Sequence, residues 1–148
     1  MTLSWAETAR RVIARAADRC EYCRMHQALQ GASFHIEHIN PQSAGGPDTP
    51  DNLALACPGC NLKKSNRLTA PDPETGAEVP LFNPRADGWD DHFAWDGYRV
   101  VGRTAVGRAT VAAFDWNHPR RVRIREAEKH FGLFPPAQTE SREQLPPA

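Results

Sequence analysis

The chain has 148 residues, 40% of them apolar, which suits one globular domain with a modest core. Its formal net charge is +0, so overall charge does not indicate a nucleic-acid partner, and no apolar run approaches the length of a membrane span. Because the N-terminal segment lacks the apolar core of a signal peptide, we expect a cytoplasmic protein with no membrane partner.

The first expected element is a helix that begins after Ser4 and leads into Cys20. Ser4 and Glu7 form the pattern of a capping box, in which each side chain bonds the backbone of the other residue. The apolar residues that can share one face of this helix are Trp5, Val12, Ile13 and Ala16. We therefore expect the helix to pack along one side and to deliver the chain to its first cysteine.

The middle of the chain has the pattern of a strand, a loop, a second strand and a helix. Residues 34–39, FHIEHI, predict a short strand, and residues 53–56, LALA, form a short apolar run. The intervening residues 40–52 are rich in Pro, Gly, Asn and Asp, which is typical of a loop. Residues 59–68, GCNLKKSNRL, are compatible with a helix.

The segments that follow are less regular. Residues 70–92 are acidic and look irregular. Residues 93–103 alternate around an Asp-Gly turn signal and predict a hairpin. Residues 104–114 are compatible with either a strand or a helix. The aromatic residues expected to pack this region onto the rest of the chain are Trp89, Phe93 and Trp95.

The C-terminal part is basic. Between Gly97 and Phe131 basic residues outnumber acidic ones, so the sequence allows a basic face there. A helix is expected to begin after Pro119 and to end near Gly132. Residues 135–148 are polar and rich in Pro, and we expect this tail to be disordered.

The four cysteines form two C-x-x-C pairs, Cys20 with Cys23 and Cys57 with Cys60. In a cytosolic chain this pattern indicates a zinc site, because each pair supplies two thiolates on a tight turn and two pairs complete a tetrahedron. The alternatives are a redox C-x-x-C pair or buried free thiols. A site of four thiolates has no open position for a substrate, so any catalysis must come from other residues.

Between the two cysteine pairs, and just after the second pair, lie side chains that are suited to hydrolysis. Glu37 and His38 lie in the first predicted strand, Asn52 ends the loop and Asn61 follows the last cysteine. Histidine is the side chain best suited to take a proton from water near neutral pH. Carboxylate and amide oxygens are hard donors that suit Mg²⁺. One such metal could hold a scissile phosphate while the histidine activates water.

Taken together, these motifs resemble the pattern of HNH endonucleases of the zinc-supported, four-cysteine, bacterial and phage-like type. The residues that carry the resemblance are Cys20, Cys23, Glu37, His38, Pro41, Gly45, Gly46, Asn52, Leu53, Cys57, Cys60, Asn61 and Lys64. The resemblance is dense from Cys20 to about Arg67, and it is specific because cysteine pairs and catalytic positions interleave in one order. It implies an α+β fold: a small ββα-metal (His-Me finger) core stabilised by the four-cysteine zinc site, with an N-terminal helix and a C-terminal hairpin and helix.

Carried over by position, the resemblance implies a role for each polar residue of the motif. His38 would be the general base, and Glu37 and Asn61 would hold a catalytic Mg²⁺, Mn²⁺ or other divalent metal. Asn52 would bond the loop that carries His38 and so aim the imidazole, while the glycine pair of that loop would leave room for a phosphate backbone. An ideal strand sends consecutive side chains to opposite faces, so Glu37 and His38 can reach one metal only if the strand ends or twists there.

Other polar residues near the motif have two interpretations each. The basic residues Lys63, Lys64 and Arg67 are candidates for binding nucleic-acid phosphates, with ordinary surface solvation as the alternative. His35 could be a third ligand or a phosphate donor, but we expect an exposed strand position. The histidines expected to be structural or exposed are His92, His118 and His130.

The leading hypothesis is a metal-dependent HNH endonuclease that hydrolyses phosphodiester bonds in DNA. Residues 1–69 would form the nuclease core, residues 70–134 an extension that packs on it, and residues 135–148 the tail. The alternative is a zinc-stabilised nucleic-acid-binding module without catalysis, for which four cysteines and a basic helix suffice. A protein-interaction zinc domain is a third hypothesis. The Glu37-His38 pair favours the nuclease, because a binding module does not need a carboxylate facing phosphates.

Overall fold

The structure, a computed structural model, describes residues 2–137 as short helices and three separate two-stranded antiparallel sheets. The helices are α1 (Trp5–Ala16), α2 (Pro58–Lys64), α3 (Trp89–His92), α4 (Ala105–Ala113) and α5 (Pro119–His130). The strand pairs are β1 (His35–His38) with β2 (Leu53–Ala56), β3 (Thr69–Pro71) with β4 (Glu78–Pro80), and β5 (Phe93–Asp96) with β6 (Arg99–Gly102). Short 3₁₀ helices occupy Gln27–Leu29, Gln42–Ala44 and Pro50–Asn52. The predicted α+β class is confirmed.

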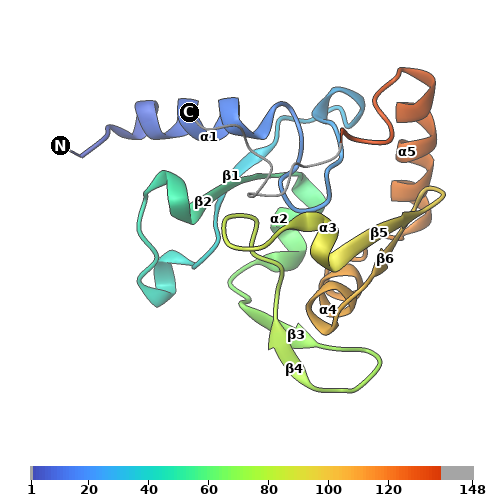
Figure 1. Cartoon of the computed structure of the whole chain (residues 1–148). Helices are drawn as coiled ribbons and strands as arrows, with labels where there is room; N and C mark the ends of the chain where they lie inside the picture. The colour runs from blue at the N-terminus through green and yellow to red at the C-terminus, as the bar shows by residue number, and fades with distance from the viewer. Residues whose placement is uncertain (1, 138–148) are drawn as a thin grey trace.

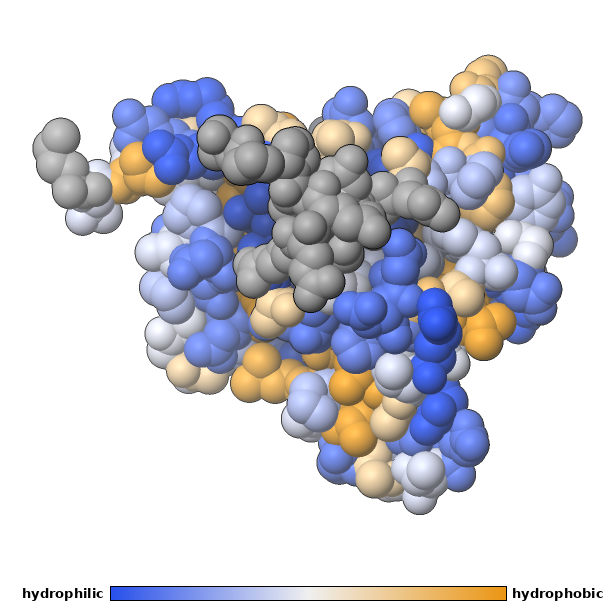
Figure 2. Space-filling view, viewed as in Figure 1, coloured by the Kyte–Doolittle hydropathy of each residue, from blue (hydrophilic) through white to orange (hydrophobic). Residues whose placement is uncertain are grey.

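The elements are arranged around the β1–β2 pair and α2. Figure 1 shows α1 and α5 at opposite ends of the molecule, with β1, β2 and α2 between them and the β3–β4 hairpin extending from the body. The face seen in Figure 2 is mainly hydrophilic, and its apolar residues form small separate groups. Within residues 2–137 no helix combines the length and the apolar character needed to cross a membrane.

Helix α1 begins at the predicted capping box. Ser4 Oγ accepts from the Glu7 backbone N–H at 3.2 Å, and Glu7 Oε2 accepts from the Ser4 backbone N–H at 3.0 Å. The predicted apolar face is only partly used: Val12 is fully buried, whereas Trp5 is 52% exposed. The buried stripe of α1 faces β2, so this helix covers one side of the central strand pair.

The motif residues from Glu37 to Lys64 lie on four consecutive parts of the chain: β1, the loop after it, β2 and α2. In the antiparallel register Glu37 lies opposite Ala54 and His38 opposite Leu53, and every residue of β2 is buried. Cys57 caps α2 and Pro58 takes its first position, where a missing N–H costs nothing. The expected continuation of this helix to residue 68 is wrong: α2 ends at Lys64, and Ser65 follows with a positive φ of 50°.

The expectation that residues 70–92 are irregular is also wrong in part, since they contain most of the β3–β4 hairpin and α3. The reason is Asp72, which is fully buried rather than solvated. Its carboxylate accepts from the Glu74 backbone N–H at 3.1 Å and from Thr75 Oγ1 at 2.9 Å, which shapes the turn of the hairpin. Arg108 donates to both of its oxygens, at 3.0 and 2.9 Å, and holds the hairpin on α4.

The C-terminal elements follow the predictions more closely. The β5–β6 hairpin and α5 are confirmed, and the ambiguous residues 104–114 form α4, which Thr104 caps by accepting from Gly107 N. Trp89 and Phe93 are buried, and the Trp89 indole donates to the Tyr22 carbonyl at 2.9 Å. Chain divisions at residues 69 and 134 stay predictions.

The predicted tail lies mostly outside the described residues. Of residues 135–148, only 135–137 fall within the described range, and they form neither helix nor strand. The prediction of disorder for residues 138–148 therefore concerns a part of the chain that the structure does not describe.

The end of α2 leads to a first prediction. Ser65 combines φ 50° with ψ −128°, a conformation that a side chain disfavours and that glycine adopts readily. We expect Ser65→Gly to raise the free energy of unfolding by about 1 kcal/mol, measured by urea denaturation of the metal-loaded protein. Ser33→Gly is the matched control, because Ser33 is exposed in a loop without positive φ, and it should not stabilise. Equal effects of the two substitutions would contradict the strain at Ser65.

Candidate metal centre and active site

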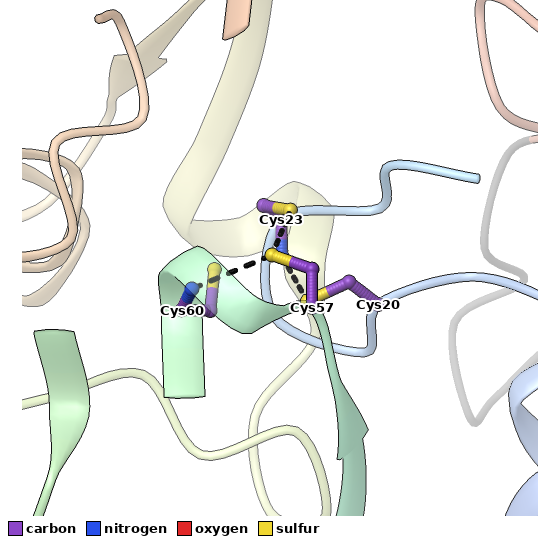
Figure 3. A group of neighbouring side chains, drawn as sticks. All are labelled: Cys20, Cys23, Cys57 and Cys60. Carbon is purple, nitrogen blue, oxygen red and sulfur yellow. Dashed lines mark hydrogen bonds between the residues drawn. The ribbon is translucent and has the colours of Figure 1, made fainter. Parts of the chain in front are cut away.

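The four cysteines come together in one buried cluster. Their sulfur atoms all lie within 4.8 Å of one another, and Figure 3 shows the side chains of the loop after α1 and of the start of α2 gathered at one point. Sulfur atoms at 2.3 Å from a tetrahedral zinc lie about 3.8 Å apart, and the Cys23 and Cys57 sulfurs are separated by 3.8 Å. The cysteines are therefore positioned to bind a metal ion, as predicted, and their soft thiolates suit zinc.

Both cysteine pairs have the local geometry of a metal-binding turn. The Cys23 N–H points to Cys20 Sγ at 3.5 Å, and the Cys60 N–H points to Cys57 Sγ at 3.4 Å. Each pair thus stabilises one of its own sulfurs with a backbone donor. This arrangement favours thiolates over neutral thiols, which is what metal binding needs.

Two side chains from the C-terminal region also reach the sulfurs, and no motif in the sequence indicated either of them. Trp116 is fully buried and donates its indole N–H to Cys60 Sγ at 3.3 Å. Arg121, on α5, places Nη1 3.5 Å from Cys60 Sγ and 3.9 Å from Cys57 Sγ. Burial alone would lower the pKa of Arg121, but the negative charge of the cysteines raises it. The C-terminal region therefore supplies charge compensation to the metal centre.

Gly59, between the second pair of cysteines, makes room for this arginine. A Cβ at this position would lie 2.2 Å from Arg121 Nη2. Any larger residue would push the guanidinium away from Cys57 and Cys60. The glycine of this pair is thus explained by the close approach of α5 rather than by backbone conformation.

A second group of polar residues surrounds a cavity of about 560 Å³ beside the cluster. Glu37, His38 and Asn61 all line it, so the end of β1 and the middle of α2 face the same space. Glu37 and His38 are consecutive residues of a strand, yet both border this one cavity. His38 is the last residue of β1, so the strand ends at this point. Asn61 lies on α2, directly after the last cysteine, and is partly buried.

Glu37 is held by two partners. Its side chain is only 6% exposed, Tyr22 donates its hydroxyl to Oε2 at 2.7 Å, and Lys64 Nζ lies 2.7 Å from Oε1. Lys64 pairs with Oε1 through its charge, and among the described residues no donor meets the geometry of a hydrogen bond to this oxygen. Burial raises the pKa of Glu37 against the opposing effects of Lys64 and Tyr22. The sequence did not reveal Tyr22, which lies between the first two cysteines.

The expectation that Lys64 is a surface contact for phosphate is corrected. Its side chain is 3% exposed, because Nζ is paired with Glu37 and also donates to the His38 carbonyl at 3.1 Å. A buried ammonium that already has two partners is not presented to an incoming phosphate. Lys63 and Arg67 are exposed, and their contact with nucleic acid stays a prediction.

His38 contacts a residue that the sequence did not single out. Its Nε2 lies 2.7 Å from Asp48 Oδ1, and Gln42 donates to the same oxygen at 3.1 Å. Hydrogen bonding by His38 and then by Gln42 lowers the pKa of Asp48, so this carboxylate stays ionised. The only sequence signal is an acidic residue in the loop after β1, which is common in loops.

Asn52 ties together the two ends of the loop between β1 and β2. Its Oδ1 accepts from the Asn40 backbone N–H at 2.9 Å, and its Nδ2 donates to the carbonyls of Asn40 at 3.0 Å and Pro47 at 2.9 Å. A Cβ at Gly46 would lie 1.7 Å from the Asn40 carbonyl oxygen. This glycine is therefore required by the fold of the loop itself, and room for a phosphate backbone at the glycine pair stays a prediction. A role of Asn52 in catalysis stays a prediction.

The four histidines predicted to be exposed or structural do not line the cavity beside the cysteine cluster. His35 is exposed on β1. His92 pairs with Thr104 Oγ1 at 2.6 Å, and His118 caps α5 by accepting from Arg120 N at 3.1 Å, so both are structural as expected. His130 is exposed at the end of α5, also as expected.

Comparison with known proteins gives one match. Residues 20–67 match the family described as HNH endonuclease, which is the segment that carries the resemblance in the sequence. No curated protein and no solved structure matches the chain. The matched segment contains all four cysteines, both strands of the β1–β2 pair and the cavity residues of α2, so the resemblance is confirmed for this part of the chain.

The cysteine cluster leads to a second prediction. Cys57→Ser should lower the zinc content and unfold the domain, because binding of a structural metal contributes directly to folding. Serine keeps an oxygen at this position to cap α2, so the loss would report the metal rather than the cap. Zinc content by elemental analysis and secondary structure by circular dichroism test this. A folded Cys57→Ser protein without zinc would contradict it.

A third prediction concerns the charge near the sulfurs. Removing a side chain that contacts a metal ligand typically lowers metal affinity by roughly 10- to 100-fold. We therefore expect the Arg121→Gln variant to lose zinc to a chelator about tenfold faster than the unaltered protein. Arg123→Gln removes the same charge from an exposed position of the same helix and serves as the control. Equal transfer rates for both variants would show that Arg121 does not stabilise the metal centre.

Proposed function

We propose that this chain is a metal-dependent HNH endonuclease that hydrolyses phosphodiester bonds in DNA in the cytoplasm. The observation that carries the proposal is the common cavity of Glu37, His38 and Asn61, which lies within the segment that matches the HNH endonuclease family. A base and two oxygen donors facing one space are what metal-assisted hydrolysis of a phosphate ester requires.

The donor atoms fit a divalent cation of the magnesium type. Glu37 brings a carboxylate to the cavity, and Asn61 offers an amide oxygen from α2. We expect these two residues to hold Mg²⁺, Mn²⁺ or a similar ion, whose remaining positions would go to water and phosphate. When bound, such an ion supplies positive charge that stabilises the leaving oxygen. Lys64 balances the carboxylate charge and keeps Glu37 in place.

His38 would act as the general base. Its imidazole takes a proton from water, the water oxygen forms a bond to phosphorus, and the bond from phosphorus to the leaving oxygen breaks. Asn52 supports this by fixing the loop that follows His38 through three hydrogen bonds. The cysteine cluster lies outside this chemistry, because a zinc with four thiolate ligands has no position for a substrate.

Two exposed basic residues at the end of α2 would bind the phosphate backbone. Lys63 on α2 and Arg67 just after it are solvent-exposed and close in sequence to Asn61. Contacts of this kind contribute affinity without sequence preference and weaken as salt increases.

A nucleic-acid-binding module without catalysis is the second candidate, and one observation favours it. The exposed basic residues of α5 are Arg120, Arg123 and Lys129. They could bind phosphates without any cleavage. This candidate does not explain a buried carboxylate and a histidine on the same cavity, and cleavage assays separate the two functions directly.

The fourth prediction tests the base. His38→Ala should reduce cleavage of plasmid DNA in Mg²⁺ or Mn²⁺ by roughly 10²- to 10⁴-fold, the usual contribution of general-base catalysis. Its zinc content should not change, since His38 is not a ligand of the cysteine cluster. His35→Ala is the matched control: this histidine lies on the same strand, is exposed and should be dispensable.

The same assay on single-stranded, double-stranded and branched DNA identifies the preferred substrate. If His38→Ala and the unaltered protein cleave equally, the activity comes from a contaminant or another site and the assignment of His38 is wrong. Binding without cleavage in both proteins would favour the second candidate.

A further inference from the structure

We propose that Asp48 is a positioning residue for His38, and that it selects the ring nitrogen that takes the proton from water. This inference rests on the proposed function, because it assigns a partner to the proposed base. It arises from one contact, the 2.7 Å distance between His38 Nε2 and Asp48 Oδ1. Asp48 lies ten residues after His38 in the chain, at the far side of the β1–β2 loop.

The contact is built by the loop rather than made by a free surface side chain. Asn52 Nδ2 donates to the Pro47 carbonyl at 2.9 Å and so fixes the residue just before Asp48. The same amide group donates to the Asn40 carbonyl at 3.0 Å, two residues after His38. One side chain therefore sets the separation between the histidine and the carboxylate.

Further contacts reduce the freedom of the Asp48 carboxylate. Gln42 donates to the Oδ1 atom that faces His38, at 3.1 Å. Gly46 lets the two arms of the loop approach, since a Cβ there would lie 2.9 Å from Asn52 Nδ2 and still closer to Asn40. The carboxylate remains 56% exposed, whereas the imidazole is 19% exposed. Because this side chain is largely exposed, we expect its replacement to change stability little, so its effect on His38 can be measured separately.

An ionised carboxylate accepts a hydrogen bond and cannot donate one, so the His38 nitrogen that faces it carries the proton. Neutral His38 is then the Nε2–H tautomer, and Nδ1 keeps the lone pair that accepts the proton of the attacking water. Without Asp48 both tautomers are available and the ring is free to rotate. The base would then be in the productive form for only part of the time.

The first test is kinetic and uses saturating Mg²⁺ with the DNA substrate that the chain cleaves best. We expect Asp48→Ala to lower kcat at least about tenfold while KM for DNA stays unchanged, because binding does not involve this carboxylate. Asp48→Glu keeps a carboxylate within reach and should recover much of kcat. Asp51→Ala is the control, because Asp51 is an exposed acid of the same loop without contact to His38.

The second test does not need activity. Nitrogen NMR spectra of the histidine-labelled, zinc-loaded protein distinguish the two neutral tautomers of a histidine ring, and His38→Ala assigns the signals. We expect the Nε2–H form for His38 in the unaltered protein and a mixture of tautomers in Asp48→Ala.

The outcomes separate the two proposals. An Nδ1–H tautomer in the unaltered protein, or a kcat that Asp48→Ala leaves unchanged, would overturn the role of Asp48 while the nuclease assignment stands. Absence of cleavage by the unaltered protein would overturn the proposed function instead, and the tautomer would still report whether Asp48 holds His38.

Discussion

The meeting of two distant C-x-x-C pairs in one buried cluster is the constraint on which the rest of the structure depends. A metal bound at this cluster closes a loop of chain that contains β1, the following loop and β2. A metal ion bound there would contribute directly to the folding free energy, because the site forms only when the chain folds. Trp116 and Arg121 connect the same centre to the C-terminal region and help to fix that region to the matched segment.

The residues between the first two cysteines connect the metal centre to the proposed active site. Glu21 forms two hydrogen bonds with Leu55 of β2, both at 2.8 Å. The Glu21 N–H donates to the Leu55 carbonyl, and the Leu55 N–H donates to Glu21 Oε2. Tyr22 donates to Glu37, the proposed ligand of the catalytic ion. A metal bound by the four cysteines would thus also hold the turn that positions Glu37 in the proposed active site.

Buried charges are where the sequence is least informative. Asp72 pairs with Arg108 and Glu37 pairs with Lys64, and nothing in the sequence indicates either pairing. A buried charge needs a partner at close range, and that partner can come from any part of the chain. This explains why the β3–β4 hairpin and the burial of Lys64 were not predicted. It also shows that surface roles assigned to single charges from sequence need the structure.

Signals that act over a few residues determined a good part of this protein from sequence alone: the capping box at Ser4, the cysteine pairs, the hairpin near residue 97, and the order of Glu37, His38 and Asn61. These signals depend on residue spacing and backbone chemistry within a short stretch of chain. Only the tertiary structure decided that Glu37 and His38 share one cavity, and that Tyr22 and Asp48 are their partners. Strand alternation by itself would separate the two neighbours, and a partner far along the chain is chosen by burial and close approach, which no local pattern encodes.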